Sequence, residues 1–441
     1  MVILGGGESG VGAAVLAKKK GYDVVLMDEG SLKEGYRNEL QEAGVEFMEG
    51  SVDEERLLNA EEVVKSPGIP EKNDFVKKLR EKSIPIISEV ELAYRYKGNS
   101  KIIAITGSNG KSTTTSLIHH ICKTAGLDAA LVGNIGYSFA RQVAEDPKPI
   151  YVAEISSFQL DDIVTFRPDV ALLLNITEDH LDRYDYKFEN YIRSKFRIAM
   201  NQTSEDHFIF NLDDEVIAAY MKENNIISNQ LPFSMKQKVE KGAYIKDDTM
   251  HVNAGPEQHD MSIFDFALQG RHNQANTMAA SVAGATMEIR KDKIREAVQT
   301  FDNLEHRMEP VATVRGVEFI NDSKATNINS TWFALESMGK PTVLILGGVD
   351  KGNDYSLLQD LVLEKVKAIV CLGVDNKKIH EAFEKDVRIV DTRSAEDAVR
   401  TAYSLSTSGD VVLLSPGCAS FDLFKNYEDR GRQFKQAVKD L

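Results

Sequence analysis

The stretch Lys101-Ile102-Ile103-Ala104-Ile105-Thr106-Gly107-Ser108-Asn109-Gly110-Lys111-Ser112-Thr113 carries the strongest structural signal in the chain. Residues 101–105 form an apolar run of the length of a buried strand, and residues 112–123 place apolar side chains at helical spacing. A glycine loop between strand and helix is typical of phosphate binding, because backbone N–H groups surround the phosphate, Lys111 neutralises it and the Ser112 hydroxyl can ligate Mg²⁺. The strict P-loop pattern requires a glycine where Ile105 stands, so the sequence predicts a shorter variant.

A second glycine loop opens the chain, with the sequence Gly5-Gly6-Gly7-Glu8-Ser9-Gly10-Val11-Gly12. It fits the pattern G-x-G-x-x-G between a predicted strand at residues 2–4 and a helical stretch at residues 13–20, and Asp28 ends the next predicted strand. The glycines let the backbone approach a diphosphate, and the helix N-terminus supplies N–H donors. The pattern alone does not distinguish NAD from another nucleotide diphosphate.

Strands and helices alternate along most of the chain. Strands are predicted at residues 2–4, 23–27, 63–64, 84–87, 101–105, 129–132, 150–153, 170–174, 342–346, 368–372, 387–390 and 411–414. A polar, turn-rich segment at residues 230–268 predicts a small β excursion, and residues 273–287 return to helix. This alternation predicts an α/β fold with parallel sheets.

The length predicts three domains, since 441 residues are available and a domain takes roughly 150. We expect a Rossmann-like N-terminal domain at residues 1–97. A P-loop central ATPase domain, with a parallel sheet plus the β excursion, is expected at residues 98–304. A Rossmann-like C-terminal domain is expected at residues 305–441.

The composition argues against several classes of protein. The formal charge of −15 disfavours general binding of DNA or RNA, which requires a basic surface. No apolar run approaches the ~20 residues of a membrane span, and the N-terminus enters a strand pattern without the basic segment of a secretory signal. Cys122, Cys371 and Cys418 are few and far apart, which suits a reducing compartment. We therefore expect a cytoplasmic protein.

Candidate metal ligands follow two of the predicted strands. Glu154 comes directly after the strand at residues 150–153, and His180 lies in a polar segment beyond the strand at residues 170–174. A carboxylate at the carboxyl end of a strand facing a P-loop is the usual place for a Mg²⁺ ligand. Lys195 lies on a predicted helix fifteen residues after His180, and by itself it would be taken as a surface lysine.

Several blocks together resemble the Mur ligase family of ATP-dependent amide-forming enzymes of peptidoglycan synthesis. The matching blocks are Thr106–Thr113, Glu154–Gln159, Asp179–Arg183 with Lys195, Gly270–Asn276, Glu305–Arg307, Asn321–Asn327 and Leu414–Asp422 continuing to Tyr427. They cover nearly the whole chain in order. Within the family, residues 156–160 and 415–427 resemble the D-glutamate-adding members, and the Asp-Asn-Pro-Arg signature of the diaminopimelate-adding members is missing from the sequence.

The resemblance implies a ligase that phosphorylates a carboxylate with ATP and lets an amine attack the acyl phosphate. Its substrates would be UDP-N-acetylmuramoyl-L-alanine, D-glutamate and ATP, with two Mg²⁺ ions and a monomeric chain. It implies catalytic roles for Lys111, Glu154, His180 and Lys195. The implied metal ligands are Ser112, Glu154, His180 and a carbamylated Lys195. The implied ATP contacts are Gly107, Ser108, Asn109, Gly110, Lys111, Ser112, Thr113, Asn273, Asn276, Arg307, Asp322 and Lys324.

The same resemblance implies that the first glycine loop holds UDP. The implied contacts to the UDP-linked substrate are Gly7, Ser9, Gly10, Asp28, Ser66, Gly68, Asn134, Ser156 and His180. The implied D-glutamate contacts are Lys324, Thr326, Lys351, Ser420 and Tyr427. The chain departs from the family at Glu29-Gly30, where a hydroxyl and a basic residue are commoner, and at Tyr427, where Phe is frequent.

Other functions are compatible with parts of the sequence. An NAD-dependent oxidoreductase would account for the first glycine loop alone. Independently of that alternative, Asn273 is also a candidate helix cap, a role compatible with an ATP contact. A P-loop regulator would bind nucleotide without D-glutamate-stimulated phosphate release. The folate-type branch of the family is disfavoured by the full glycine-loop domain that precedes the P-loop.

Overall fold

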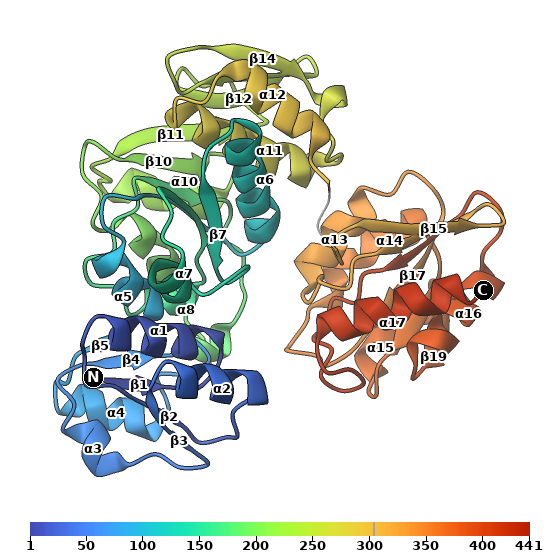
Figure 1. Cartoon of the computed structure of the whole chain (residues 1–441). Coiled ribbons are helices and arrows are strands. Elements are labelled where there is room, and N and C mark those ends of the chain that lie inside the picture. Colours follow the sequence, from blue (N-terminus) through green and yellow to red (C-terminus); the bar gives the residue numbers. More distant parts are fainter. Residues whose placement is uncertain (303–304) are drawn as a thin grey trace. The chain divides into compact units, whose positions relative to one another are not determined.

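The computed structural model describes residues 1–302 and 305–441, which form two compact units (Figure 1). The first unit holds residues 1–267 and 273–301, and the second holds residues 268–272 and 302–441. Leu304, where we placed the end of the central domain, lies outside the described residues. The domain bounds therefore stay predictions, whereas the described residues do contain three separate sheets.

The first sheet is parallel and belongs to the first unit. Its strands are β1 (Val2–Leu4), β2 (Val25–Asp28), β3 (Glu46–Glu49), β4 (Val63–Lys65) and β5 (Ile86–Ile87). The accompanying helices are α1 (Glu8–Lys19), α2 (Glu34–Glu42), α3 (Glu54–Leu58), α4 (Asp74–Glu81) and α5 (Glu89–Tyr96). The strand order β3-β2-β1-β4-β5 is Rossmann-like, as predicted. Four strands were predicted near these bounds, but β3 was not, because its Glu-Phe-Met-Glu sequence leaves both glutamates exposed.

The second sheet forms the rest of the first unit. Its strands are β6 (Lys101–Thr106), β7 (Ala129–Gly133), β8 (Ile150–Glu154), β9 (Val170–Leu173), β10 (His207–Asn211), β11 (Asn229–Ser234), β12 (Gly242–Lys246), β13 (Thr249–Asn253) and β14 (His259–Ser262). The helices are α6 (Lys111–Thr124), α7 (Phe139–Glu145), α8 (Ser157–Leu160), α9 (Phe188–Phe196), α10 (Glu215–Glu223), α11 (Arg271–Thr286) and α12 (Lys291–Thr300). The order is β14-β13-β12-β11-β10-β9-β6-β8-β7.

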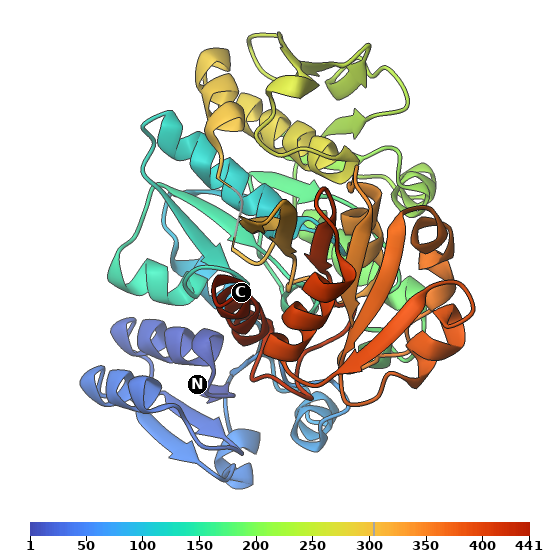
Figure 2. The ribbon, with the colours of Figure 1, turned by 90° about the vertical axis from the view of Figure 1, so that its right-hand side faces the viewer.

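The predicted β excursion is confirmed at one edge of this sheet. The pairs β12–β13 and β13–β14 are antiparallel, whereas the strands from β7 to β12 pair in parallel. Figure 2 shows the excursion beside the helices α11 and α12. The suggestion that Asn273 caps a helix is wrong, because α11 begins at Arg271 and Asn273 lies within its first turn.

The helix α1 joins the first sheet to the second within one core. A Cβ at Gly12 would lie 2.0 Å from Ser138 Oγ, so α1 and the start of α7 approach as closely as a glycine allows. Ile3 and Leu16 belong to the same buried apolar cluster as Tyr151. The two glycine loops of the first unit are therefore carried on a shared scaffold.

The third sheet forms the second unit. Its strands are β15 (Glu309–Val314), β16 (Val317–Asn321), β17 (Thr342–Leu346), β18 (Val366–Leu372), β19 (Arg388–Thr392) and β20 (Val411–Leu414). Its helices are α13 (Ile328–Glu336), α14 (Gln359–Lys365), α15 (Lys377–Phe383), α16 (Ala395–Leu405) and α17 (Tyr427–Lys439). The order is β15-β16-β20-β17-β18-β19, and only β15 among these described strands runs antiparallel to its neighbour. Within residues 1–302 and 305–441, every helix is too short or too polar to cross a membrane.

Candidate active site

The predicted P-loop lies between β6 and α6, as the sequence indicated. Gly107 and Gly110 take φ values of +154° and +80°, which side chains other than glycine rarely adopt. The Lys111 ammonium folds back over the loop and donates to the carbonyl oxygens of Gly107 at 2.8 Å and Ser108 at 2.9 Å. Asn175, two residues beyond the end of β9, supports the loop, since its side-chain oxygen accepts from the Asn109 N–H at 2.8 Å.

The first half of α11 brings two of the predicted ATP contacts to this loop. A Cβ at Gly110 would lie 2.5 Å from Asn276 Oδ1, so the Asn276 amide rests directly on the loop backbone. Asn273 lies one turn earlier and its side-chain oxygen accepts from Asn276 Nδ2 at 3.4 Å. Both asparagines are buried, together with the Ser108, Ser112 and Thr113 side chains of the loop. Residues 107–113, Asn273 and Asn276 thus form one polar cluster.

Glu154 and Asn134 meet at the carboxyl ends of β8 and β7. The Asn134 amide donates to Glu154 Oε1 at 2.7 Å, and Glu154 is buried. Because β8 pairs with β6 so that Glu154 faces Ile105, the carboxylate lies at the strand position just before the P-loop. This is the edge of a parallel sheet at which ligands usually bind.

Lys195 is buried against the P-loop rather than on the surface. Its side chain is 1% exposed, and its Nζ donates to the Gly107 carbonyl at 2.9 Å and lies 4.6 Å from the Tyr191 ring centre. Burial, followed by the nearby charge of Lys111, lowers the pKa of Lys195 well below its ordinary value. Tyr191, which sequence reasoning missed, also links its hydroxyl to Ser108 Oγ at 3.2 Å.

His180 is held in a strained backbone conformation. Its φ of 54° is left-handed, which is uncommon outside glycine and is found often at functional sites. The ring lies 5.1 Å from that of Phe158, centre to centre, and its Nε2 is 3.6 Å from Asp179 Oδ2. Ser156, predicted as a substrate contact, forms a capping box with Gln159 at the start of α8, so its hydroxyl has a structural role there.

The N-terminal glycine loop is supported from two sides. Asp28 accepts the N–H of Gly6 at 2.5 Å through Oδ2 and that of Gly30 at 2.7 Å through Oδ1. On the other side, Ser66 donates to the Gly5 carbonyl at 3.2 Å. A Cβ at Gly10 would lie 1.8 Å from the Gly5 oxygen, so only glycine fits this position.

Open space lies over the same loop. Gly7 is exposed, and a Cβ added to it would meet nothing within 4 Å. Ser9 follows in the first turn of α1 and is half-buried. The loop therefore offers a free backbone surface at a helix N-terminus, the arrangement that binds phosphate groups.

Two arginines connect this loop region to the second sheet: Arg141 was not singled out from the sequence, and Arg183 was named only as the end of a block that resembles the family. Arg183 donates to the Pro67 carbonyl at 3.0 Å and to the Gly68 carbonyl at 3.5 Å, and it stacks on Phe158. Arg141 on α7 pairs with Glu8 of the glycine loop at 2.5 Å and with Glu39 at 2.8 Å. No motif signalled the hydrogen bonds and ion pairs of these arginines, because the bonded residues are more than a hundred positions apart.

In the second unit, the predicted residues gather where β16, β17 and β20 end. Asp322 is buried, accepts from Ser415 Oγ at 2.9 Å, and has its pKa raised to about 7 by burial. The Lys324 ammonium lies 5.3 Å from the Tyr427 ring centre. The positive charge of Arg307 acts on both Asp322 and His272.

The loop that carries Lys351 joins this group through the backbone. The Val349 N–H donates to the Ala419 carbonyl at 2.8 Å, which sets Lys351 near the segment that contains buried Ser420. Thr326 is half-buried beside Ala325, whose carbonyl accepts from the Gly417 N–H at 3.0 Å. Four of the five predicted D-glutamate residues, Lys324, Thr326, Lys351 and Ser420, thus lie on loops that follow strands of this sheet, and Tyr427 begins α17.

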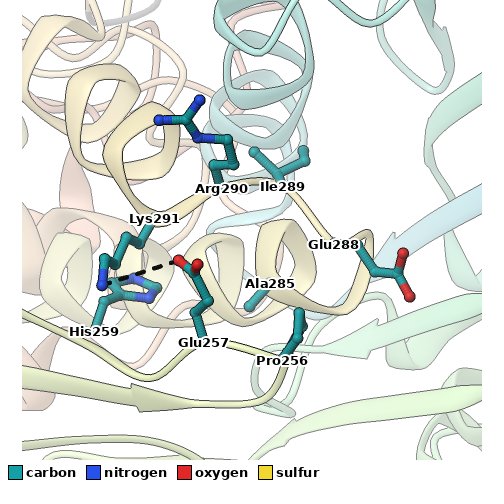
Figure 3. A pocket seen from close by; sticks show the side chains of 9 residues that line it. Pro256, Glu257, His259, Ala285, Glu288, Ile289, Arg290 and Lys291 are labelled. Carbon is teal, nitrogen blue, oxygen red and sulfur yellow. Dashed lines mark ion pairs between the residues drawn. The ribbon is translucent and has the colours of Figure 1, made fainter.

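A pocket of about 150 Å³ lies elsewhere in the first unit, between the β13–β14 connection and the junction of α11 and α12 (Figure 3). Its lining includes buried His259, whose pKa is lowered to about 4 mainly by burial, and the Lys291–Glu257 ion pair at 4.0 Å. None of the predicted site residues lines it. It is therefore separate from the candidate active site.

Comparisons with known proteins match this arrangement sheet by sheet. Family models described as "Mur ligase MurD-like, N-terminal domain", "Mur ligase middle domain" and "Mur ligase, glutamate ligase domain" match residues 1–88, 105–284 and 306–418. The chain belongs to the Mur ligase family. This confirms the family resemblance and the three-domain α/β fold predicted from the sequence.

Named relatives of this Mur ligase span its full length. A UDP-N-acetylmuramoylalanine–D-glutamate ligase of Christiangramia forsetii is 53% identical over 100% of this chain and 99% of the relative. One of Bacteroides fragilis with the same name is 52% identical with the same coverage. Among solved structures, the UDP-N-acetylmuramate-alanine ligase MurC of Thermotoga maritima has a TM-score of 0.64 at 17% identity, covering 100% of this chain and 99% of the other, which shows a shared fold.

Proposed function

We propose that this Mur ligase joins D-glutamate to UDP-N-acetylmuramoyl-L-alanine with ATP, releasing ADP and phosphate. The observation that carries the proposal is the buried Lys195 amine against the P-loop carbonyl of Gly107, in the unit that also holds the N-terminal glycine loop. The full-length likeness to D-glutamate ligases at 53% and 52% identity supports the choice of substrates. We also propose that it works as a monomer in the cytoplasm.

The donors beside the P-loop fit Mg²⁺. Ser112 and Glu154 supply oxygen atoms, the ligands that Mg²⁺ prefers, and both side chains are buried at the loop. His180 and Lys195 would hold a second ion only if Lys195 is carbamylated, because an ammonium repels a cation and a carbamate offers anionic oxygens. When bound, the ions would neutralise phosphate charge and polarise the transferred phosphoryl oxygens.

Lys195 is suited to carbamylation. Burial and the Lys111 charge lower its pKa, which increases the fraction of unprotonated amine at neutral pH. The amine nitrogen would form a bond to the carbon of CO₂ and lose one proton to solvent. The resulting carbamate would lie beside Gly107, within reach of the phosphates that the loop is proposed to bind.

The proposed reaction has two steps. The terminal carboxylate of the L-alanyl substrate attacks the γ-phosphorus of ATP, and the bond to the bridging oxygen breaks to give an acyl phosphate and ADP. Lys111 and the loop N–H groups then stabilise the charge that gathers on the transferred phosphoryl group. The amine of D-glutamate attacks the acyl carbon, loses a proton, and phosphate leaves.

Residues of the second unit would bind the amino acid. D-Glutamate carries two carboxylates, which pair well with cationic and hydroxyl groups. Lys324 and Lys351 would supply the charges, and Thr326, Ser420 and Tyr427 would supply further polar contacts. The ATP contacts proposed for Arg307 and Asp322 lie in the same unit, so catalysis would require residues from both units together.

The geometry of Asp28 disfavours the oxidoreductase alternative. In a dinucleotide fold the acidic residue after the second strand binds ribose hydroxyls. Here both carboxylate oxygens of Asp28 accept backbone N–H groups from Gly6 and Gly30. The residue thus shapes the loop itself.

The deciding experiment measures phosphate release from ATP with UDP-N-acetylmuramoyl-L-alanine, with D-glutamate, L-glutamate or neither. We expect release that needs the D isomer and a product heavier by one glutamyl unit. Phosphate release with a different amino acid would show that the protein is a Mur ligase that adds that amino acid instead of D-glutamate. ATP binding without release would support the P-loop regulator instead, and nicotinamide binding would then be measured.

A further inference from the structure

A cysteine, a histidine and an aspartate come together on three neighbouring elements of the second unit. Cys371 on β18 pairs in register with Asp391 on β19, so the two side chains leave the sheet side by side. His380 on α15 places its Nε2 3.1 Å from Asp391 Oδ2. One ligand atom from each residue, namely sulfur, imidazole nitrogen and carboxylate oxygen, lies within 4.8 Å of the other two.

This donor set is one that binds zinc-class metals. Thiolate, imidazole and carboxylate are the three protein ligands of Zn²⁺, and three of them with one open position form a four-coordinate site. Metal–ligand bond lengths of about 2.0–2.3 Å require ligand atoms roughly 3.4–3.8 Å apart. Side-chain rotations that move the ligand atoms by about 1 Å would therefore bring all three within bonding distance of one ion. Mg²⁺ is disfavoured, because it prefers oxygen ligands to sulfur.

The surroundings of the cluster support the same interpretation. Cys371 is fully buried, His380 is half-buried and Asp391 is exposed, so solvent reaches the group from the aspartate side. Asn376 donates to Asp391 Oδ1 at 2.8 Å and would orient the carboxylate as an outer-shell partner. We propose that Cys371, His380 and Asp391 form a transition-metal site of zinc class, separate from the candidate active site.

Binding would involve a defined proton release. Burial and the adjacent Asp391 raise the pKa of the Cys371 thiol, so without metal the sulfur keeps its proton. On binding, the S–H bond breaks, a sulfur–metal bond forms and the proton passes to solvent. The bound ion would tie α15 to both strands, and α15 also holds the loop before Lys351 through the Lys378–Asp350 pair at 2.8 Å.

The chain contains matched controls for two of the three ligands, the histidine and the cysteine. His251 and Asp260 in the first unit form a similar histidine–aspartate pair at 2.7 Å, but this pair is not part of a cysteine cluster in the described residues. Cys122 is buried like Cys371 and likewise belongs to no described group of metal-ligating side chains. The variants H251A and C122A therefore remove the same side chains without touching the proposed site.

The test titrates the full-length protein with Co²⁺ in the presence of excess Mg²⁺ and records absorbance. We expect one equivalent to give a thiolate-to-cobalt charge-transfer band that excess Mg²⁺ does not remove. The band should disappear in C371A, and Co²⁺ affinity should fall at least tenfold in H380A and in D391N. C122A and H251A should behave like the original protein.

Three outcomes would overturn the proposal. The first is that no charge-transfer band forms, and the second is that the band persists in C371A. If circular dichroism shows that C371A does not fold, the test rests on H380A and D391N, whose side chains are partly or fully exposed. Co²⁺ affinity that is unchanged in both of these variants would show that the cluster binds no metal.

Discussion

Glu89→Gln is expected to change how the stability of the first unit depends on pH. Glu89 begins α5 and is 1% exposed, and its Oε1 accepts from Ser138 Oγ at 2.9 Å and from the Ala140 N–H at 2.5 Å at the start of α7. Its Oε2 has no hydrogen-bond partner within the described part of the chain. Burial therefore raises the pKa of Glu89 from 4.5 to about 7.

The sign and size of the effect follow from this shift. A carboxyl whose folded pKa exceeds its unfolded pKa stabilises the fold below the unfolded value, and this stability is lost as pH rises through the folded value. With pKa values of 4.5 and about 7, the contribution at pH 5 exceeds that at pH 8 by about 2.5 kcal/mol. Glutamine does not titrate, so the difference in unfolding free energy, variant minus original, should rise by about 2.5 kcal/mol from pH 5 to pH 8.

Glu91→Gln is the matched control, since Glu91 lies two residues further along the same helix and is fully buried. Its carboxylate accepts the N–H groups of Val164, Thr165 and Phe166 at 2.8–2.9 Å, and the pKa of Glu91 is lowered. Its stabilisation is present above its unfolded pKa, so it is nearly constant from pH 5 to pH 8. The unfolding free energy of the Glu91→Gln variant should be lower than that of the original protein by about 2 kcal/mol at every pH in this range.

Urea unfolding followed by circular dichroism at pH 5, 6, 7 and 8 gives the required free energies. Trp332, the single tryptophan, lies in the second unit, so its fluorescence provides an internal reference for the other half of the chain. A variant-minus-original difference that stays within 0.5 kcal/mol across the range would refute the reasoning, because Glu89 would then titrate as if hydrated. A rising difference in the Glu91 control would refute it as well.

Three further predictions concern the proposed chemistry. Lys111→Ala should lower ATP turnover by roughly 10²-fold or more with circular dichroism unchanged, and retained turnover would exclude this lysine from phosphate binding. Lys195→Ala should abolish ligation, and added short carboxylates such as acetate should restore part of the activity. Full activity of this variant without added carboxylate would contradict the proposed carbamate at Lys195. Lys351→Ala should raise the KM for D-glutamate or lower kcat, and if neither changes, the amino acid binds elsewhere.

The sequence predicted best those elements that are buried on both faces. The strands at residues 342–346 and 411–414 have the predicted bounds, because continuous runs of Val, Leu and Ile suit only the centre of a parallel sheet. The edge strand β15 was missed, because its Glu-Pro-Val-Ala-Thr-Val sequence is largely exposed and carries no apolar run. The sequence therefore predicts a strand correctly where burial on both faces requires an apolar composition.

The candidate site was predictable where function resides in a short motif. The P-loop and the N-terminal glycine loop each contain their strand, turn and helix within about 25 residues, so the local pattern determines both. Lys195 differs, because its partner Gly107 is 88 residues away and the helix around it reads as an ordinary amphipathic segment. Only the family resemblance singled it out, and burial now gives that choice a physical basis.

The interdomain contacts of the first unit show why the remainder could not be read from sequence. Arg141, Glu8 and Glu39 are ordinary surface residues by type, yet together they hold the N-terminal glycine loop against the second sheet. Arg183 does the same for the segment at Pro67, where it contacts backbone carbonyls that any residue would supply. Because every residue has a backbone carbonyl, such a contact does not depend on the type of the partner residue and cannot be predicted from it. The positioning of the two loops therefore depends on pairs whose specificity lies in the fold, and substitutions there should alter substrate affinity while both glycine motifs stay intact.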